Sequence, residues 1–199
     1  MSIARQMVRK QGYDPYQVRD YNTTIGLFKI EMTHTWITGL SSFHRIGNMS
    51  FVIQNHTLRG NIEIGTQRLQ GTSNWEMIIV GGLLSKAGTV KFSVEYFRVG
   101  ILIQQSLDTR NKPQLEDVQL ELGNIQIRFE GAGTLDYVIE FAVNLLPNVL
   151  RYQIMDALEP LIKRRIQEEL DYINVEELIM ENAEKYDEGN LNFTIPIKF

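Results

Sequence analysis

Two long stretches of this sequence alternate between apolar and polar residues and change phase near their middle. In "VKFSVEYFRVGILIQQ" (90–105), the apolar residues occupy even positions as far as Tyr96 and odd positions from Phe97 onward. In "LEDVQLELGNIQIRFEG" (115–131), the same change occurs at 123–124. Strand side chains alternate between two faces, so a shift of one residue exchanges the inner and outer faces. We interpret each shift as a β-bulge that bends the strand and lets a strongly curved sheet keep one apolar face inside.

Three earlier segments predict further strands of the same sheet. In "GLFKIEMTHTW" (26–36), the apolar residues from Phe28 to Trp36 share one face with His34. The segments "MSFVIQNHTLRGNIEIG" and "NWEMIIVGGLL" are also typical of strands. The four residues "SKAG" (85–88) predict the turn that leads into the next strand. We therefore expect a curled sheet over residues 25–131.

A long amphipathic helix is predicted after the sheet. Apolar residues from Thr134 to Ile173 recur at intervals of three and four, and charged residues occupy the opposite face. Pro147 and Pro160 each remove one backbone hydrogen bond, so we expect bends at these two residues. A shorter helix should follow, with Asn174 as its N-cap.

These elements together predict one α+β domain over residues 1–199. In this fold a strongly curved antiparallel sheet wraps around a long C-terminal helix. Residues 1–12 are predicted to form a short helix that ends at Gly12. Residues 134–186 are predicted to be the helical region and residues 187–199 a tail.

The composition limits the cellular locations and the kinds of partner that we expect for the protein. The chain has no cysteine, which excludes disulfide bonds and thiolate chemistry. Its net charge of -4 argues against nucleic acid as a partner, and no apolar run reaches the ~18 residues of a membrane span. Four Asn-X-Ser/Thr sequons favour passage through a secretory pathway, so we predict an extracellular glycoprotein. The sequon asparagines are Asn22, Asn48, Asn55 and Asn192.

The polar residues form no pattern typical of an enzyme or a metal site. His34, His44 and His56 are separated by ten and twelve residues, which matches no helical or hairpin spacing of metal ligands. The segments "GLSSF" and "GGLLSKAG" match neither a nucleophile elbow nor a phosphate-binding loop. The acidic pair at 168–169 falls beside the polar face of the predicted helix. We therefore expect a protein with no catalytic residue, no metal and no cofactor.

The order of three motifs resembles that of the group 7 mite allergens. The motif "YDPYQV" (13–18) is followed by "IGLFKIEMTHTWITGLSSFHRIGNMSF" (25–51), by the sheet, and by a helix that contains "ALEPLIKRRIQEEL" (157–170). The resemblance extends from about Gly12 to Asn174. Group 7 allergens are similar to the arthropod juvenile-hormone-binding and takeout proteins. They also resemble half of bactericidal/permeability-increasing protein, within the tubular lipid-binding (TULIP) superfamily.

This resemblance implies a highly curved sheet around a long helix, an elongated apolar cavity between them, and secretion. Two features of the chain bear on which branch it follows. Takeout proteins usually carry an N-terminal disulfide, and the absence of cysteine here favours the mite-allergen branch. Binding of lipopolysaccharide, suggested for relatives, requires a basic tip, which a net charge of -4 disfavours.

Our leading hypothesis is a secreted, non-enzymatic carrier of a hydrophobic ligand such as a fatty acid, another lipid or a terpenoid. The alternative is a protein-interaction or innate-recognition module with a solid core, because the sequence periodicity fits both. A lipocalin-type barrel is disfavoured because the terminal helical region is too long and neither tryptophan lies in a G-x-W context. The residues predicted to line the ligand site are Phe28, Met32, Trp36, Trp75, Met77, Phe92, Val94, Tyr96, Phe97, Ile101, Leu122, Ile127, Leu145 and Val149.

Overall fold

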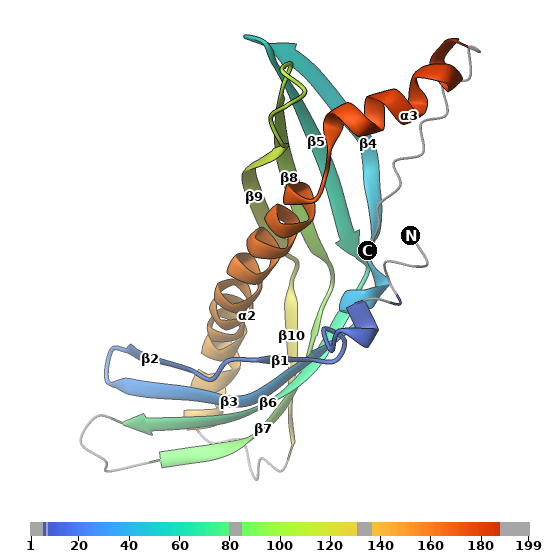
Figure 1. Ribbon diagram of the computed structural model, residues 1–199. Coiled ribbons are helices and arrows are strands. Elements are labelled where there is room, and N and C mark those ends of the chain that lie inside the picture. Colours follow the sequence, from blue (N-terminus) through green and yellow to red (C-terminus); the bar gives the residue numbers. More distant parts are fainter. Residues whose placement is uncertain (1–5, 7, 80–84, 131–136, 188–199) are drawn as a thin grey trace.

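The computed structural model describes residue 6 and residues 8–79, 85–130 and 137–187, and its strands form two antiparallel sheets (Figure 1). The six-stranded sheet, here called the proximal sheet, has the order β1-β3-β6-β7-β10, and β2 also pairs with β3. The four-stranded sheet, here called the distal sheet, has the order β4-β5-β8-β9. The proximal strands are β1 (Tyr16–Val18), β2 (Tyr21–Ile25), β3 (Phe28–Thr38), β6 (Leu69–Ile79), β7 (Ser85–Val94) and β10 (Ile125–Glu130). The distal strands are β4 (His44–Gln54), β5 (Thr57–Thr66), β8 (Phe97–Ser106) and β9 (Gln114–Leu122).

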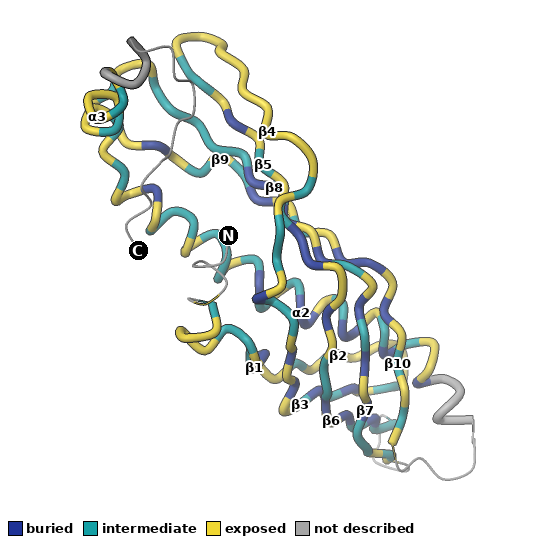
Figure 2. The backbone as a smooth tube through the Cα atoms, turned by 90° about the vertical axis from the view of Figure 1, so that its right-hand side faces the viewer, coloured by how far each residue is buried: buried dark blue, intermediate teal, exposed yellow. Residues whose placement is uncertain are grey.

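The chain crosses between the two sheets at one level of the molecule, which we call the waist (Figure 2). The short helix η1 (Leu40–Ser42) lies between β3 and β4, and two residues separate β5 from β6, β7 from β8 and β9 from β10. The last two crossings are hydrogen bonded to each other. The Glu95 N–H donates to the Asn124 carbonyl at 3.1 Å, and the Gly123 N–H donates to the Tyr96 carbonyl at 2.8 Å.

Both phase changes in the sequence are therefore breaks between strands of different sheets. The expectation of a β-bulge within a continuous strand is wrong at these two places. A break and a bulge produce the same one-residue change of phase, but after a break the chain pairs within another sheet. Val94 and Phe97 on either side of one break, and Leu122 and Ile125 on either side of the other, are all buried. The bend at the waist thus keeps one apolar face inside, and the predicted strongly curved α+β fold is confirmed.

The long helix α2 (Tyr137–Asp171) runs past both sheets (Figure 1). It contacts β9 of the distal sheet and β10 and β1 of the proximal sheet, and it continues through Pro147 and Pro160. Helix α3 (Val175–Asp187) follows. The Glu177 N–H donates to Asn174 Oδ1 at 3.2 Å, which confirms the predicted N-cap.

The described part of the N-terminal segment agrees with the predicted helix end. Residue 6 and residues 8–10 are helical, and the Tyr13 N–H donates to the Val8 carbonyl at 2.9 Å. Gly12 has a φ of 76°, the left-handed conformation that glycine adopts without strain after a helix. The remainder of this segment and residues 188–199 of the predicted tail lie outside the described residues.

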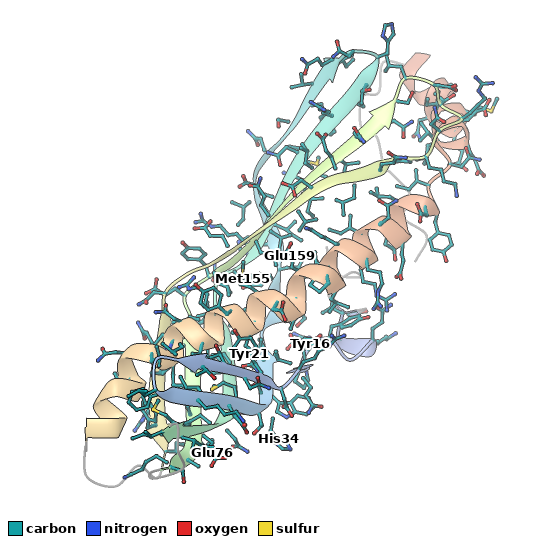
Figure 3. All side chains as sticks on the ribbon, turned by 90° about the vertical axis from the view of Figure 1, so that its left-hand side faces the viewer. Tyr16, Tyr21, His34, Glu76, Met155 and Glu159 are labelled. Carbon is teal, nitrogen blue, oxygen red and sulfur yellow. The ribbon has the colours of Figure 1, made fainter. Side chains whose placement is uncertain are left out.

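A bulge does occur in β3, and it reverses the face of Trp36. The pairing of β3 with β6 shifts register between Thr33 and Trp36, and His34 has a φ of 51°. Met32 is buried before the bulge and Ile37 after it, whereas Trp36 is 41% exposed. The expectation that His34 and Trp36 share the inner face is therefore wrong, because the register shift turns both side chains outward. Figure 3 shows His34 on the side of the proximal sheet away from α2.

The predicted turn at residues 85–88 is also wrong. Ser85 already pairs with Ile78, so these four residues belong to β7. The link between β6 and β7 falls in 80–84, outside the described residues.

Candidate ligand-binding interior

The inner faces of both sheets and one face of α2 form a contiguous apolar interior. Side chains of both sheets meet Leu146, Leu150 and Ile154 of α2 there. The predicted site residues that are buried in this cluster are Met32, Trp75, Met77, Phe92, Val94, Phe97, Ile101, Leu122 and Val149. Phe28, Ile127 and Leu145 are partly buried and pack against the same cluster. The structure thus brings these residues together, and their contact with a ligand stays a prediction.

Two predicted site residues lie outside this interior. Trp36 is on the outer face of β3 because of the bulge. Tyr96 lies at the waist, where its hydroxyl donates to the Glu121 carboxylate at 2.7 Å and the Arg98 guanidinium lies 4.5 Å from its ring centroid. The hydrogen bond to Glu121 raises the pKa of the Tyr96 hydroxyl. Glu121 and Arg98, the two partners of Tyr96, are exposed, and so is Trp36. The prediction that Trp36 and Tyr96 face the interior is therefore wrong.

A buried polar network crosses the apolar interior. Gln153 of α2 is 2% exposed, and its amide nitrogen donates to the Arg19 carbonyl at 2.7 Å and to Thr35 Oγ1 at 3.0 Å. Thr35 Oγ1 lies 2.7 Å from Ser73 Oγ on the neighbouring strand β6. The network fixes the middle of α2 to the proximal sheet. The apolar pattern does not predict it, and its one signal in the sequence is a glutamine on the apolar stripe, three residues after Leu150.

The indole of Trp75 is a second buried polar group in the interior. Trp75 is 4% exposed, and its Nε1–H has no hydrogen-bond partner. The ring packs edge-on against Phe129, with centroids 5.4 Å apart and ring planes at 84°. Its cross-strand neighbour in β7 is Gly88, where an added Cβ atom would lie 3.3 Å from Nε1. The N–H edge of the indole therefore lies beside a position of β7 that has no side chain.

Among the described residues, two hollows lie beside α2. The first, of about 300 Å³, separates α2 from β2 and is lined by Tyr21, Thr23, Ile25, Asn148, Val149 and Tyr152. Because Val149 also belongs to the buried interior, this groove borders the candidate site. The second, of about 460 Å³, lies between the C-terminal part of α2 and the distal sheet. Its lining is mainly polar and consists of Thr57, Gln104, Ser106, Asn111, Lys112, Pro113, Gln114, Gln167 and Asp171.

The "YDPYQV" motif attaches the N-terminal segment to the waist. The Asp14 carboxylate accepts hydrogen bonds from the Gly39 N–H at 2.9 Å, from the Ser41 N–H at 2.8 Å and from the Ser41 hydroxyl. Burial by itself raises the pKa of Asp14. The hydrogen bonds from Ser41 and Gly39 and the nearby Arg9 charge lower it by more, so the pKa falls below the usual 3.8. Asp14 therefore holds the chain before β1 against the crossing from β3 to β4.

A second attachment at the waist comes from α2. The Arg151 guanidinium donates to the Leu122 carbonyl at 2.5 Å and to the Gly123 carbonyl at 3.0 Å. These two carbonyls lie where β9 ends and the chain crosses to β10. The charged side chain thus supplies partners for backbone groups that no longer lie within a regular ladder.

The described residues contain neither a cluster of metal ligands nor a membrane-spanning helix. No three His, Cys, Asp or Glu side chains in this part of the chain gather closely enough to hold a metal ion. No helix in it is long and apolar enough to cross a membrane. The sequon residues Asn22, Asn48 and Asn55 are exposed, and Asn192 lies outside the described residues.

The fold and one family model place the chain among known proteins. Takeout 1 of Epiphyas postvittana aligns with a TM-score of 0.53 and 11% identity, over 89% of this chain and 93% of that one. A lipopolysaccharide binding protein aligns with a TM-score of 0.46 and 13% identity, over 84% of this chain and 38% of that one. No curated protein sequence matches the chain. The family model of the Group 7 allergens matches residues 13–170, from "YDPYQV" almost to the end of α2, and the chain therefore belongs to the Group 7 allergen family.

Proposed function

We propose that the protein is a secreted, non-enzymatic carrier or sensor of a hydrophobic ligand, which binds between the curved sheet and α2. The ligand would be a fatty acid, another lipid or a terpenoid. The observation that carries the proposal is the contiguous apolar interior, which both sheets and α2 share. Membership of the Group 7 allergen family and the fold shared with Takeout 1 support it.

The affinity would come from burial of apolar ligand surface. At roughly 25 cal/mol per Å², removing about 300 Å² of a ligand from water contributes about 7.5 kcal/mol before the cost of association is subtracted. Phe28, Ile127 and Leu145 are only partly buried, so these predicted site residues are incompletely covered by the protein itself. Met32 and Met77 add flexible side chains that can adapt to the shape of a ligand.

Secretion is supported by the sequons. Asn22, Asn48 and Asn55 are exposed, so each is accessible to the glycosylation machinery. Expression in a eukaryotic secretory host, followed by glycosidase treatment and intact-mass measurement, tests both secretion and glycosylation. A medium fraction without added glycan mass would contradict the glycoprotein part of the proposal.

The first experiment on ligand binding is native mass spectrometry of the purified protein, followed by organic extraction and lipid analysis. A co-purified apolar molecule, or uptake of an added fatty acid, is the expected result. A single apo mass that does not change on addition of fatty acid would favour the alternative, a solid-core interaction module.

A pair of neighbouring residues on α2 provides a matched test of where the ligand binds. Ala142 is fully buried against the sheet, whereas Val143 is 41% exposed. If the interior holds a ligand, Ala142→Trp fills that space, so the variant folds but loses fatty-acid uptake, while Val143→Trp retains it. If the core is solid, Ala142→Trp lowers stability by about 1–3 kcal/mol or more through overpacking. Thermal unfolding and native mass spectrometry on both variants distinguish the two results.

A further inference from the structure

We propose that the Nε1–H of Trp75 is the polar anchor of the ligand site and donates a hydrogen bond to a carbonyl or carboxylate oxygen of an otherwise apolar ligand. The inference rests on the proposed function, because it assigns a chemical feature to the same ligand. It predicts that the protein distinguishes lipids that carry an acceptor oxygen from pure hydrocarbons.

The first argument is the absence of a partner for a deeply buried donor. Trp75 is 4% exposed and its Nε1–H is unpaired, whereas the equally buried Gln153, Thr35 and Ser73 hydrogen bond to one another. A buried donor without a partner costs free energy, so native proteins contain few such groups and each requires an explanation. The unpaired N–H therefore points to an acceptor that the described chain does not supply.

Two other buried atoms in the described residues lack a partner, but neither is fixed in the way that the indole is. They are Thr66 Oγ1 and Gln105 Oε1. A threonine hydroxyl can rotate toward a partner. The Gln105 side chain already donates to the carbonyls of Ser106 and Asn111, each at 2.8 Å. The indole N–H has one direction for each ring orientation, so its partner must lie in line with it.

The second argument is the geometry around the indole. The edge-on contact with Phe129 fixes the ring. The cross-strand neighbours of Trp75 are Met32 and Gly88, and neither side chain can accept a strong hydrogen bond. A Cβ atom added at Gly88 would lie 3.3 Å from Nε1, 3.6 Å from Cε2 and 3.7 Å from Cζ2, so the indole packs closely against the backbone of β7 at this position. The site therefore has a fixed donor in an apolar surround.

These features define the ligand chemistry. A donor without positive charge selects an acceptor oxygen, and the surrounding apolar residues select a hydrocarbon body. In such a dry environment a hydrogen bond is electrostatically stronger than in water. A site built around a donor also discriminates against an analogue that lacks the acceptor, because the donor then stays unpaired. Acids and esters with long chains fit this description, and alkanes of the same length do not.

The test uses three ligands of equal chain length: dodecanoic acid, methyl dodecanoate and dodecane. Their affinities are measured on the full chain by displacement of a fluorescent apolar probe, for the wild type and for Trp75→Phe. The substitution keeps an aromatic ring against Phe129 and removes the N–H. We expect it to weaken acid or ester binding about tenfold relative to dodecane, the factor that corresponds to one hydrogen bond of 1.4 kcal/mol. A fall for the acid alone or for the ester alone supports the inference and identifies the partner as a carboxylate or a neutral carbonyl.

A second measurement does not alter Trp75. The chain has two tryptophans, so Trp36→Phe, a change at a 41% exposed position, leaves Trp75 as the sole indole fluorophore. Acid or ester should shift its emission to longer wavelength, and dodecane should not. Equal losses for all three ligands in Trp75→Phe, with no ligand-specific emission shift, would overturn the inference and leave the carrier function intact. If none of the three ligands binds the wild type, the proposed function fails and this inference fails with it.

Discussion

Replacement of Gln153 by leucine tests whether the buried polar network holds α2 in place. The amide of Gln153 donates to the Arg19 carbonyl at 2.7 Å and to Thr35 Oγ1 at 3.0 Å, and Thr35 keeps Ser73 as a partner when the amide is lost. Two net hydrogen bonds contribute about 2 kcal/mol, and the carbonyl left without its partner adds about 1 kcal/mol. Burial of the apolar leucine side chain recovers part of the lost free energy. We expect Gln153→Leu to lower the free energy of unfolding by about 2–3 kcal/mol.

The assay is urea unfolding followed by circular dichroism. An unchanged slope m shows that each variant exposes the same surface on unfolding as the wild type. Gln126→Leu, at an exposed position of β10, is the matched control and should change stability by less than about 0.5 kcal/mol. The double variant Thr35→Val/Gln153→Leu should be less destabilised than the sum of the single variants, since both substitutions remove the contact between Gln153 and Thr35. A Gln153→Leu protein as stable as the control, or exact additivity with Thr35→Val, would refute the assignment of this network as an attachment of α2.

Two further predictions concern the waist. The pKa of Asp14 is lower in the folded protein than its usual 3.8, so the carboxylate stabilises the fold above that pH, and the stabilisation disappears as the pH falls through the folded-state pKa. The stability advantage of the wild type over Asp14→Asn should therefore shrink between about pH 6 and pH 2 in chemical unfolding, and parallel pH profiles would contradict this explanation. A Cβ atom at Gly123 would lie 2.8 Å from Tyr96 Cδ1 and 3.0 Å from the Tyr96 backbone nitrogen, whereas one at Gly100 meets its nearest neighbour at 3.8 Å. Gly123→Ala should lower the free energy of unfolding by about 1–3 kcal/mol in the same assay, and Gly100→Ala should lower it by less. Equal losses would show that the close contact with Tyr96 is not the cause of the destabilisation.

The sequence predicts the architecture well because burial follows a simple period in both kinds of element. The stripe of α2 and the one-sided strands follow from spacing alone, and most of the predicted inner-face residues are buried together. The nature of the phase changes does not follow, since a bulge and a break shift the alternation equally. Only the pairing partners of Val94 and Phe97 distinguish them. Val94 pairs within the proximal sheet and Phe97 within the distal one.

The errors at Trp36 and at the polar network have other physical causes. The bulge in β3 depends on a positive φ at His34 in a segment without glycine, so the sequence carries no conformational signal for it. Gln153 occupies a position on the apolar stripe, and its burial depends on acceptors that are more than one hundred residues away in the chain, such as Thr35 Oγ1. The unpaired donor of Trp75 could not be predicted either, because alternation gives the face of a side chain and not its partners.

The breaks at the waist limit how far the effect of a longer or shorter strand on register and facing extends. In an uninterrupted strand, insertion of one residue exchanges the inner and outer faces along the rest of that strand. Here an insertion within β8 would alter the pairing of the distal sheet only as far as the crossing at 95–96, and β7 would keep its register with β6 and β10. The two halves of the curved layer can therefore acquire insertions and deletions separately during evolution. One end of the interior can diversify in shape while the other keeps its own contacts with α2.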